Sequence, residues 1–303
     1  MPAKDIPRRR GREGIQRLPL NCLRVKRDLQ LAFPVTRERF EHFRKVLAPL
    51  PLIITNLDYE IVFGMESYEA LRKGPEIPSR IRVLCLDIAD PEALLLNFNL
   101  THRLAGVNLH EKLVFLQKIR KYLNPEEIRE GAPGLDIPIN ARLVSQLDRL
   151  TSGPFKVALA GGRVTLKTAV SLSVLPVADA RILLAFFTDF PFSHSYQRKI
   201  VEIMEELKFT YKSPVRRILK KAGISTRNRD SLSPEKVFQR LYALRYPRVT
   251  RREQAFQKEI KKFSLPENIR VSHPDFFEKN HLDVHIRVSD GKALAELLRK
   301  LRF

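Results

Sequence analysis

The stretch IVFGMESYEALRKG, residues 61–74, predicts a short apolar strand, a sharp turn at Gly64 and an amphipathic helix. A strand that leads through a glycine into a helix is a common way to hold a phosphate, because the first turn of a helix has free N–H groups. A phosphate loop usually adds Arg or Lys after the glycine, whereas Glu66 and Ser67 stand here. Three interpretations are open: a nucleotide site, a nucleotide site that has lost its charges, or an ordinary turn.

The sequence on both sides of this stretch predicts a mixed α/β domain over residues 15–122. Alternating apolar residues indicate strands, two of which form a hairpin around Asn56-Leu-Asp58. Extended segments are expected at residues 15–25, 52–55, 59–63 and 80–87. Helices are expected at residues 36–46, 91–99 and 109–122. Asp90 is the expected N-cap of the second helix, with Pro91 at its first position.

From residue 124 onward the pattern is mainly helical. Asn124 followed by Pro125 and two acids is a strong helix start, and a Gly/Pro-rich break follows at Gly131–Gly134. Further helices are expected at residues 140–150, 165–175, 178–187 and 195–209. The chain ends in two alternating segments, 268–272 and 282–288, and a last helix with a leucine face from Leu294 to Leu301. A ββα unit of this size buries little by itself, so it either packs on the rest of the chain or pairs with a second copy, and strand edges with a leucine face suit a homodimer.

The helix expected at residues 140–150 has two different faces. Leu143, Leu147 and Leu150 share one face, and the opposite face has side chains that can hydrogen-bond to base edges and phosphates. These polar side chains are Arg142, Ser145, Gln146 and Arg149. A helix, a break and a second helix with a polar face form the outline of a helix-turn-helix. The sequence therefore suggests a DNA-reading helix here, although a plain surface helix can also contain two arginines.

Positive charge is concentrated in two segments. The formal net charge is +21, of which residues 1–27 contribute +7 and residues 208–262 contribute +13, from 17 Lys and Arg against four Asp and Glu. Such clustering indicates a polyanionic partner, usually nucleic acid, with an anionic membrane surface as the other candidate. The cationic pairs Arg216-Arg217 and Lys220-Lys221 are typical of exposed helical faces.

The sequence gives little sign of other chemistry. Cys22 and Cys85 are the only cysteines, which excludes a disulfide framework, and the histidines lack the spacing of metal ligands. No apolar run approaches the roughly 20 residues of a membrane span, and the N-terminus lacks the apolar core of a signal peptide. We therefore expect a cytoplasmic protein without a metal site.

In the order of its parts, the chain resembles the ParB/sulfiredoxin superfamily, and within it the partition-protein (ParB) type. The first stretch that carries the likeness, Pro51–Ile54 through Gly64–Ala70, is similar to the family's strand–Gly-x-Arg-Arg loop. The second, Leu96–Arg103 leading to Asn108–Lys112, is similar to its Glu-Asn-x-x-Arg motif. The third stretch resembles the family's recognition helix and the helices after it, and it comprises Ala141–Leu150, Pro154–Ala158 and Gly162–Ala169. The likeness covers about residues 15–207.

This resemblance implies a fold and a function. It implies an α+β protein with a ParB/sulfiredoxin-like first domain that binds CTP with magnesium, a helix-turn-helix that reads a DNA site, and a dimer that slides on DNA as a clamp. Such dimers segregate chromosomes or plasmids, in some systems with a partner ATPase. The implied parts are a basic disordered arm (1–14), the first domain (15–122), the helix-turn-helix domain (123–207), a basic helical segment (208–264) and a ββα tail (265–303).

The residues of the implied nucleotide site depart from the family's pattern. Gly64 matches, but Glu66 and Ser67 replace the two arginines that would hold a triphosphate. Asn99 matches the asparagine, while Phe98 stands where a magnesium-binding glutamate would be. His102 falls at the arginine position and Arg103 follows it. CTP hydrolysis is therefore not expected, and weak anion binding through Gly64, Ser67, Asn99, His102 and Arg103 is open.

The interpretation that follows is a nucleoid-associated, ParB-like DNA-binding protein with an altered nucleotide pocket. An enzyme on the same scaffold is the alternative: a nucleotide-dependent kinase, a phosphohydrolase or a nuclease with Glu66 as general base. A scaffold that binds a partner protein or RNA is a third. The residues expected to contact double-stranded DNA are Arg142, Ser145, Gln146, Arg149, Arg163, Lys167, Lys220 and Lys221.

Overall fold

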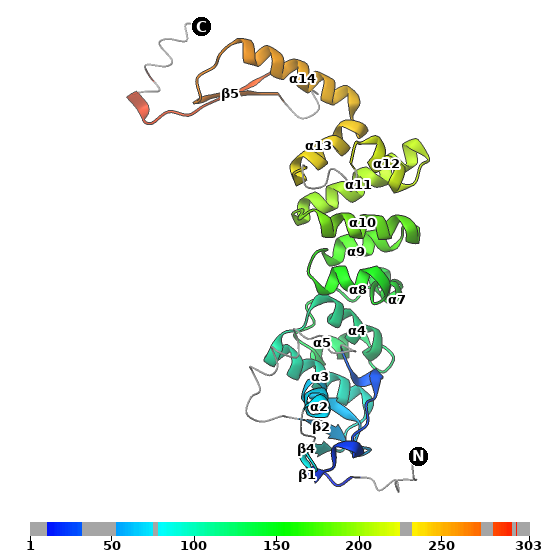
Figure 1. Cartoon of the computed structure of the whole chain (residues 1–303). Helices are drawn as coiled ribbons and strands as arrows, with labels where there is room; N and C mark the ends of the chain where they lie inside the picture. Colours follow the sequence, from blue (N-terminus) through cyan, green and yellow to red (C-terminus); the bar gives the residue numbers. More distant parts are fainter. Residues whose placement is uncertain are drawn as a thin grey trace. The chain divides into compact units, whose positions relative to one another are not determined.

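The computed structural model describes residues 11–31, 53–74, 78–224, 232–273, 281–292 and 295. The chain divides into two compact units, Met1–His194 and Ser195–Phe303, and each is considered by itself (Figure 1). The helix expected at residues 36–46, the leucine face of the expected last helix and most of the basic arm lie outside the described residues. The domain boundaries expected within these units stay a prediction.

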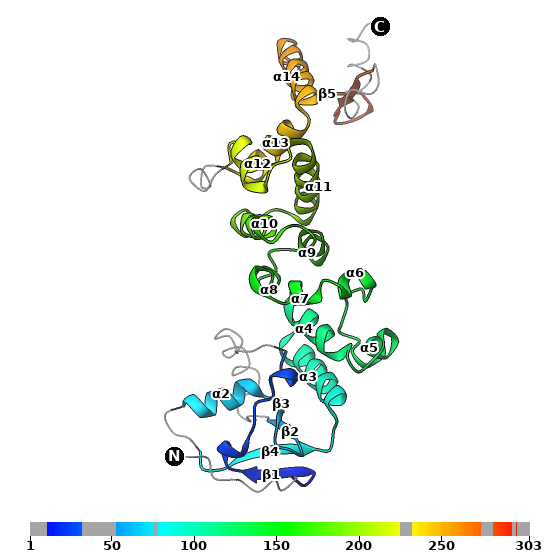
Figure 2. The same ribbon diagram turned by 90° about the vertical axis from the view of Figure 1, so that its right-hand side faces the viewer.

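The first unit contains a mixed four-stranded sheet in the order β1-β4-β2-β3 (Figure 2). The central pair, β4 and β2, is parallel, and both outer pairs are antiparallel. The four strands are β1 (Gly14–Leu18), β2 (Ile54–Asn56), β3 (Ile61–Phe63) and β4 (Ile81–Leu86). This confirms the expected hairpin around Asn56-Leu-Asp58. At the end of the arm expected over residues 1–14, Gly14 belongs to β1 and the Gly11 amide donates to the Leu57 carbonyl at 2.7 Å.

Helix α2 (Met65–Lys73) starts where the opening stretch predicts it. Gly64 has φ of 88° and ψ of 28°, a left-handed conformation that glycine adopts without strain, and this turns the chain from β3 into the helix. Met65 is buried in the core under the sheet, with Tyr68 and Leu71 packed against it. The apolar positions of the opening stretch therefore anchor α2 to the sheet.

Two long helices follow the sheet, α3 (Asp90–Ala105) and α4 (Leu109–Ile119). They pack against each other through Phe98 and Phe115, whose rings stack with centroids 4.2 Å apart. The expected N-cap of α3 is wrong by one residue: the cap is Ala89, and Asp90 is the first helical residue. The Glu92 carboxylate accepts a hydrogen bond from the Ala89 amide, which fixes this start.

The short 3-10 helix η2 (Arg27–Leu29) is held by side chains from α3 and α4. Lys118 donates to the carbonyls of Arg27 at 2.8 Å and Gln30 at 2.6 Å, and Asn97 donates to the Leu29 carbonyl at 2.6 Å. Burial lowers the pKa of Lys118. These side chains donate hydrogen bonds to backbone carbonyls that lie outside any sheet or long helix.

The rest of the first unit is helical. Its helices are α5 (Pro125–Gly131), α6 (Ala141–Val144), α7 (Leu147–Leu150), α8 (Gly153–Ala160), α9 (Leu166–Ser173) and α10 (Val177–Asp189). The expected single helix at residues 140–150 is wrong, because the chain breaks at Ser145 and Gln146 into α6 and α7. The expected apolar face is correct, since Leu143, Leu147 and Leu150 are all buried. Helix α7 packs against α4, α8 and α9.

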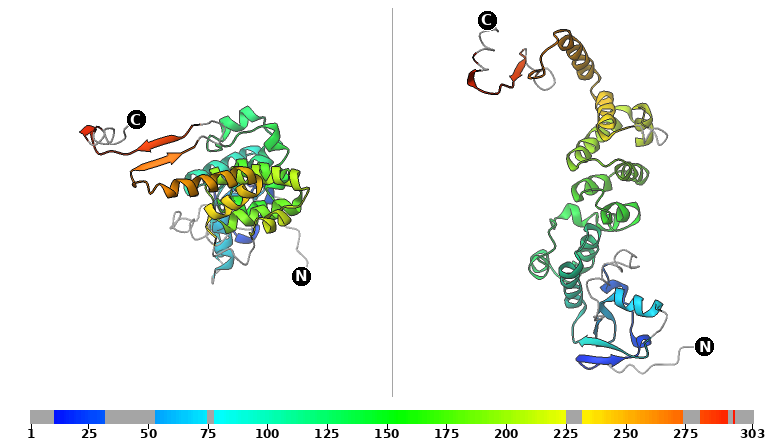
Figure 3. Two further views of the ribbon diagram at one scale, coloured as in Figure 1. Left: turned by 90° about the horizontal axis from the view of Figure 1, so that it is seen from above. Right: turned by 60° about the vertical axis from the view of Figure 1, so that its left-hand side comes forward.

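The second unit contains four helices and a hairpin among its described residues. They are α11 (His194–Tyr211), α12 (Val215–Lys221), α13 (Pro234–Arg245), α14 (Pro247–Lys262), β5 (Ile269–Ser272) and β6 (Asp283–Ile286). The rings of Tyr196 and Phe238, 4.9 Å apart, join α11 to α13. The antiparallel hairpin lies beside α14, where Phe256 meets His273 edge to face (Figure 3). The two expected C-terminal strands are thereby confirmed.

Candidate nucleic-acid interface

The predicted reading face is split between two short helices. Arg142 and Ser145 are exposed, and Gln146 is half-buried at the N-cap of α7. The Ser145 hydroxyl donates to the Arg142 carbonyl at 3.0 Å, which ends α6. Arg142 and Ser145, on α6 and at its C-cap, are thus accessible to a ligand, whereas Arg149 lies on the separate helix α7.

Arg149 has a different environment from the other three. Its guanidinium donates to the carbonyls of Ser173 and of Leu175, the latter at 2.7 Å, and it lies 5.9 Å from the ring centroid of Phe155. These bonds connect α7 to the end of α9. Arg149 therefore has a packing role, and we do not include it in the surface proposed below to contact DNA.

A cavity of about 590 Å³ opens between α4, α6 and α9. Two of the predicted residues, Arg142 and Lys167, meet at this cavity from different helices. Lys112 and Asp136 also line it and form an ion pair, and the ammonium of Lys112 lowers the pKa of Asp136. Sequence reasoning missed this pair, because partners 24 residues apart share no local pattern.

The other cations predicted to contact DNA are exposed. Arg163 lies just before α9 in the first unit. Lys220 and Lys221 end α12 in the second unit, where the Lys221 ammonium lies 3.7 Å from the centroid of the Tyr211 ring. Helix α14 has no buried residue and exposes its arginines and lysines. These exposed cations on α14 are Arg248, Arg251, Arg252, Lys258, Lys261 and Lys262.

The start of α2 does not suit a triphosphate. Glu66 stands in the first turn with 9% of its surface exposed, and Ser67 is half-buried. A carboxylate in the first turn is stabilised by the partial positive charge of the helix N-terminus and repels another anion there. Neither residue can replace the bidentate fork of an arginine. The first turn of α2 contains Glu66 and no cation.

The remaining residues of the implied nucleotide site contact their own chain. Asn99 donates to the Gly131 carbonyl at 2.8 Å, at the end of α5. His102 is exposed and stacks on Phe98 with ring centroids 6.1 Å apart. Phe98 is fully buried, and its hydrocarbon ring has no oxygen that could bind magnesium. Arg103 is exposed. These residues do not fit CTP with magnesium.

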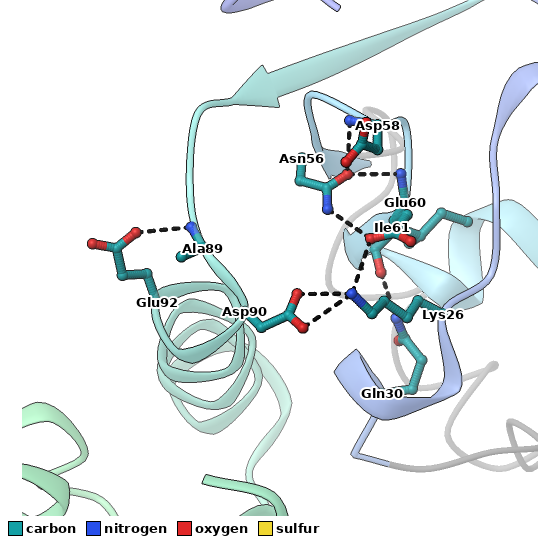
Figure 4. A network of polar contacts seen from close by, with 9 residues as sticks. All are labelled: Lys26, Gln30, Asn56, Asp58, Glu60, Ile61, Ala89, Asp90 and Glu92. Carbon is teal, nitrogen blue, oxygen red and sulfur yellow. Dashed lines mark hydrogen bonds and ion pairs between the residues drawn. The ribbon is translucent and has the colours of Figure 1, made fainter. Parts of the chain in front are cut away.

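A network of polar contacts joins the β2–β3 hairpin to the start of α3 (Figure 4). The ammonium of Lys26 lies 2.9 Å from Asp90 and 3.3 Å from Glu60, which also accepts a hydrogen bond from Asn56 at 2.8 Å. The hydrogen bond to Asp90 raises the pKa of Lys26. Lys26 therefore pairs with two carboxylates of the chain itself, those of Asp90 and Glu60, which indicates a structural role.

Within the described ranges, no group of three or more His, Cys, Asp or Glu side chains could hold a metal ion. None of the helices described there has the length and apolar character needed to cross a membrane.

Comparison with known proteins gives a relative that matches part of the chain. No protein-family model matches the chain. It is 34% identical over 139 residues to the tRNA 5-methylaminomethyl-2-thiouridine biosynthesis bifunctional protein MnmC of Chromobacterium violaceum, a match that covers 41% of this chain. The match spans only 20% of the length of that curated relative.

Among solved structures, the chain is similar to the C-terminally truncated chromosome-partitioning protein ParB from Caulobacter crescentus complexed with CTP-γ-S. The likeness covers 58% of this chain and 99% of that chain, at 18% sequence identity and a TM-score of 0.24. The neighbour is a ParB, the family that the sequence resembles. At this TM-score the likeness carries no argument of its own.

Proposed function

We propose that the chain binds double-stranded DNA as a ParB-type, nucleoid-associated protein and does so without hydrolysing CTP. The observation that carries the proposal is the net charge of +13 over residues 208–262. Exposed cations at this density neutralise phosphates and release counterions, which drives binding of a duplex of any sequence. Lys220 and Lys221 of α12 supply part of this contact.

Sequence discrimination is proposed for the first unit. Arg142, Ser145 and Gln146 have donors and acceptors suited to base edges, and Arg163 and Lys167 are cations suited to phosphates nearby. Asn140 accepts from the Leu143 amide at 2.9 Å and so fixes the start of α6 that presents Arg142. Contacts of these two kinds would position the chain on DNA and select a site.

The hairpin is proposed to form a homodimer. Leu282 and Val284 are 53% and 57% exposed, and a two-stranded hairpin is marginal by itself in water. Pairing with a second copy would cover these side chains and place two DNA-binding units on one duplex. A partner ATPase is also proposed on the resemblance alone.

The test is to incubate the whole chain with sheared genomic DNA at several salt concentrations and sequence the retained fragments, with and without a nucleotide mixture. Sharp sites that do not respond to nucleotide are the expected result. Because the partial relative is named for tRNA modification, bulk tRNA is the competitor. If tRNA displaced the DNA at equal mass and no fragment was enriched, the DNA proposal would be wrong and an RNA-binding role would replace it.

A further inference from the structure

The cavity between α4, α6 and α9 has the size of a small-molecule site. Its volume of about 590 Å³ lies within the roughly 300–1,000 Å³ typical of ligand pockets. Three separate segments supply its walls: the start of α4, residues 136–143, and α9. A space enclosed by elements this far apart in the sequence can select a ligand by shape.

Most of the wall is apolar. Leu109, Ile137, Leu143, Leu166 and Val170 all line the cavity. These five side chains offer no hydrogen bonds to a sugar-phosphate backbone, and DNA interfaces are more polar than this part of the wall. An occupant therefore needs an apolar or aromatic body to replace water against these side chains.

The charged side chains that line the cavity have a positive net charge. Lys112, Arg142 and Lys167 line it, against the single carboxylate of Asp136. The Lys112 side chain is 13% exposed and the Asp136 side chain is 74% exposed, so the cation is the inner member of the pair. This balance attracts an anion and repels a cation.

We propose that this cavity binds a small organic anion with an apolar or aromatic body and one or two carboxylate, sulfonate or phosphate groups. The apolar wall takes the body, and Arg142 and Lys167 take the acidic group. The site does not depend on DNA binding. Because Arg142 belongs also to the proposed DNA surface, an occupant would reduce the charge that this surface presents to DNA.

The experiment uses 8-anilinonaphthalene-1-sulfonate, an aromatic anion whose fluorescence rises in apolar surroundings, with the full chain and no DNA. The expected result is saturable binding of one probe per chain. Ser171→Trp, which fills the cavity, should lower the affinity at least tenfold, and Lys167→Glu, at an exposed position, should lower it about three- to tenfold. Inorganic sulfate alone should compete only weakly, because it lacks an apolar body.

The matched control is Lys121→Glu, which makes the same charge change on an exposed residue just beyond the C-terminal end of α4. Lys121 is nine residues from Lys112 in the sequence and does not line the cavity. Circular dichroism of each variant checks that it is folded. Equal probe affinity in Lys167→Glu and Lys121→Glu, or binding that does not saturate, would overturn the proposal whether or not the chain binds DNA.

Discussion

The guanidinium of Arg149 donates a hydrogen bond of 2.7 Å to the carbonyl of Leu175, just beyond the C-terminal end of α9. The same group donates to the Ser173 carbonyl. Carbonyls at the end of a helix have no partner inside it, so Arg149 satisfies groups that would otherwise depend on water. One side chain thus connects α7 with the turn between α9 and α10.

We expect Arg149→Ala to destabilise the chain by about 1–3 kcal/mol, because it leaves partly buried carbonyls unsatisfied. Urea unfolding followed by circular dichroism measures this change. Arg142→Ala is the matched control: Arg142 is exposed, and its removal should change the free energy of unfolding by less than about 0.5 kcal/mol. Equal stability of the two variants would show that the carbonyl contacts of Arg149 contribute nothing.

Gln146→Ala and Arg142→Ala should reduce the preference for the selected DNA site over random DNA. Loss of a base-edge contact typically costs about 1–3 kcal/mol of discrimination, or roughly 5- to 150-fold in affinity ratio. Fluorescence anisotropy with both duplexes gives the ratio. If the variants lost affinity for both duplexes equally, these side chains would be phosphate contacts only.

The Lys220→Ala/Lys221→Ala double variant should weaken binding to all duplexes about equally. It should also reduce the slope of log affinity against log salt by about 2, since each lost phosphate contact removes roughly one released counterion. The matched control is Arg198→Ala/Lys199→Ala, which removes two exposed cations from α11, outside residues 208–262. A change of equal size in the control would mean that the net charge of the unit matters and the position of the cations does not.

Leu282→Asp with Val284→Asp should shift the chain from dimer toward monomer in sedimentation equilibrium. The new carboxylates would be buried without partners in the apolar contact between the two copies, and burying an unpaired charge weakens the dimer. Ile15→Asp is the control, since Ile15 is 77% exposed on β1 and lies outside the hairpin. A wild-type monomer at micromolar concentration would contradict the proposed dimer directly.

His110 gives the first unit a pH dependence. Burial lowers the pKa of His110 below the ordinary 6.5, and its Nε2 lies 3.1 Å from the Thr151 carbonyl. Since the unfolded chain takes up the proton more readily, the contribution to stability is complete above pH 6.5 and is lost as the pH falls through the folded pKa. Urea unfolding between pH 5 and 8 should show this loss, and His110→Gln should flatten it.

The strands and α2 could be predicted from the sequence because their signals are local. Residues 61–74 contain an apolar strand, a glycine that tolerates a left-handed turn, and an amphipathic helix, and each feature is found in the fold. Residues 15–25 are predictable only as extended: β1 pairs with β4 over 60 residues away in the sequence, and Leu20–Cys22 form a 3-10 helix instead.

The candidate site was harder to predict because its contacts are distant in the sequence. The apolar spacing from Leu143 to Leu150 continues through Ser145 and Gln146, so periodicity alone predicts one helix where the chain forms two. The role of Arg149 depends on carbonyls more than 20 residues away, and the pairing of Lys112 with Asp136 spans a similar distance. Residue type indicated a basic surface, but only the fold separates accessible cations from cations used in packing.

The support of η2 has a consequence for the order in which the chain can fold during synthesis. The carbonyls of Arg27 and Gln30 depend on Lys118, and β1 depends on β4. At a translation rate of about 5–20 residues per second, roughly 5–20 seconds separate the synthesis of β1 from that of Lys118. The N-terminal segment therefore emerges from the ribosome long before its partners, and the first unit can close only after α4 has been made.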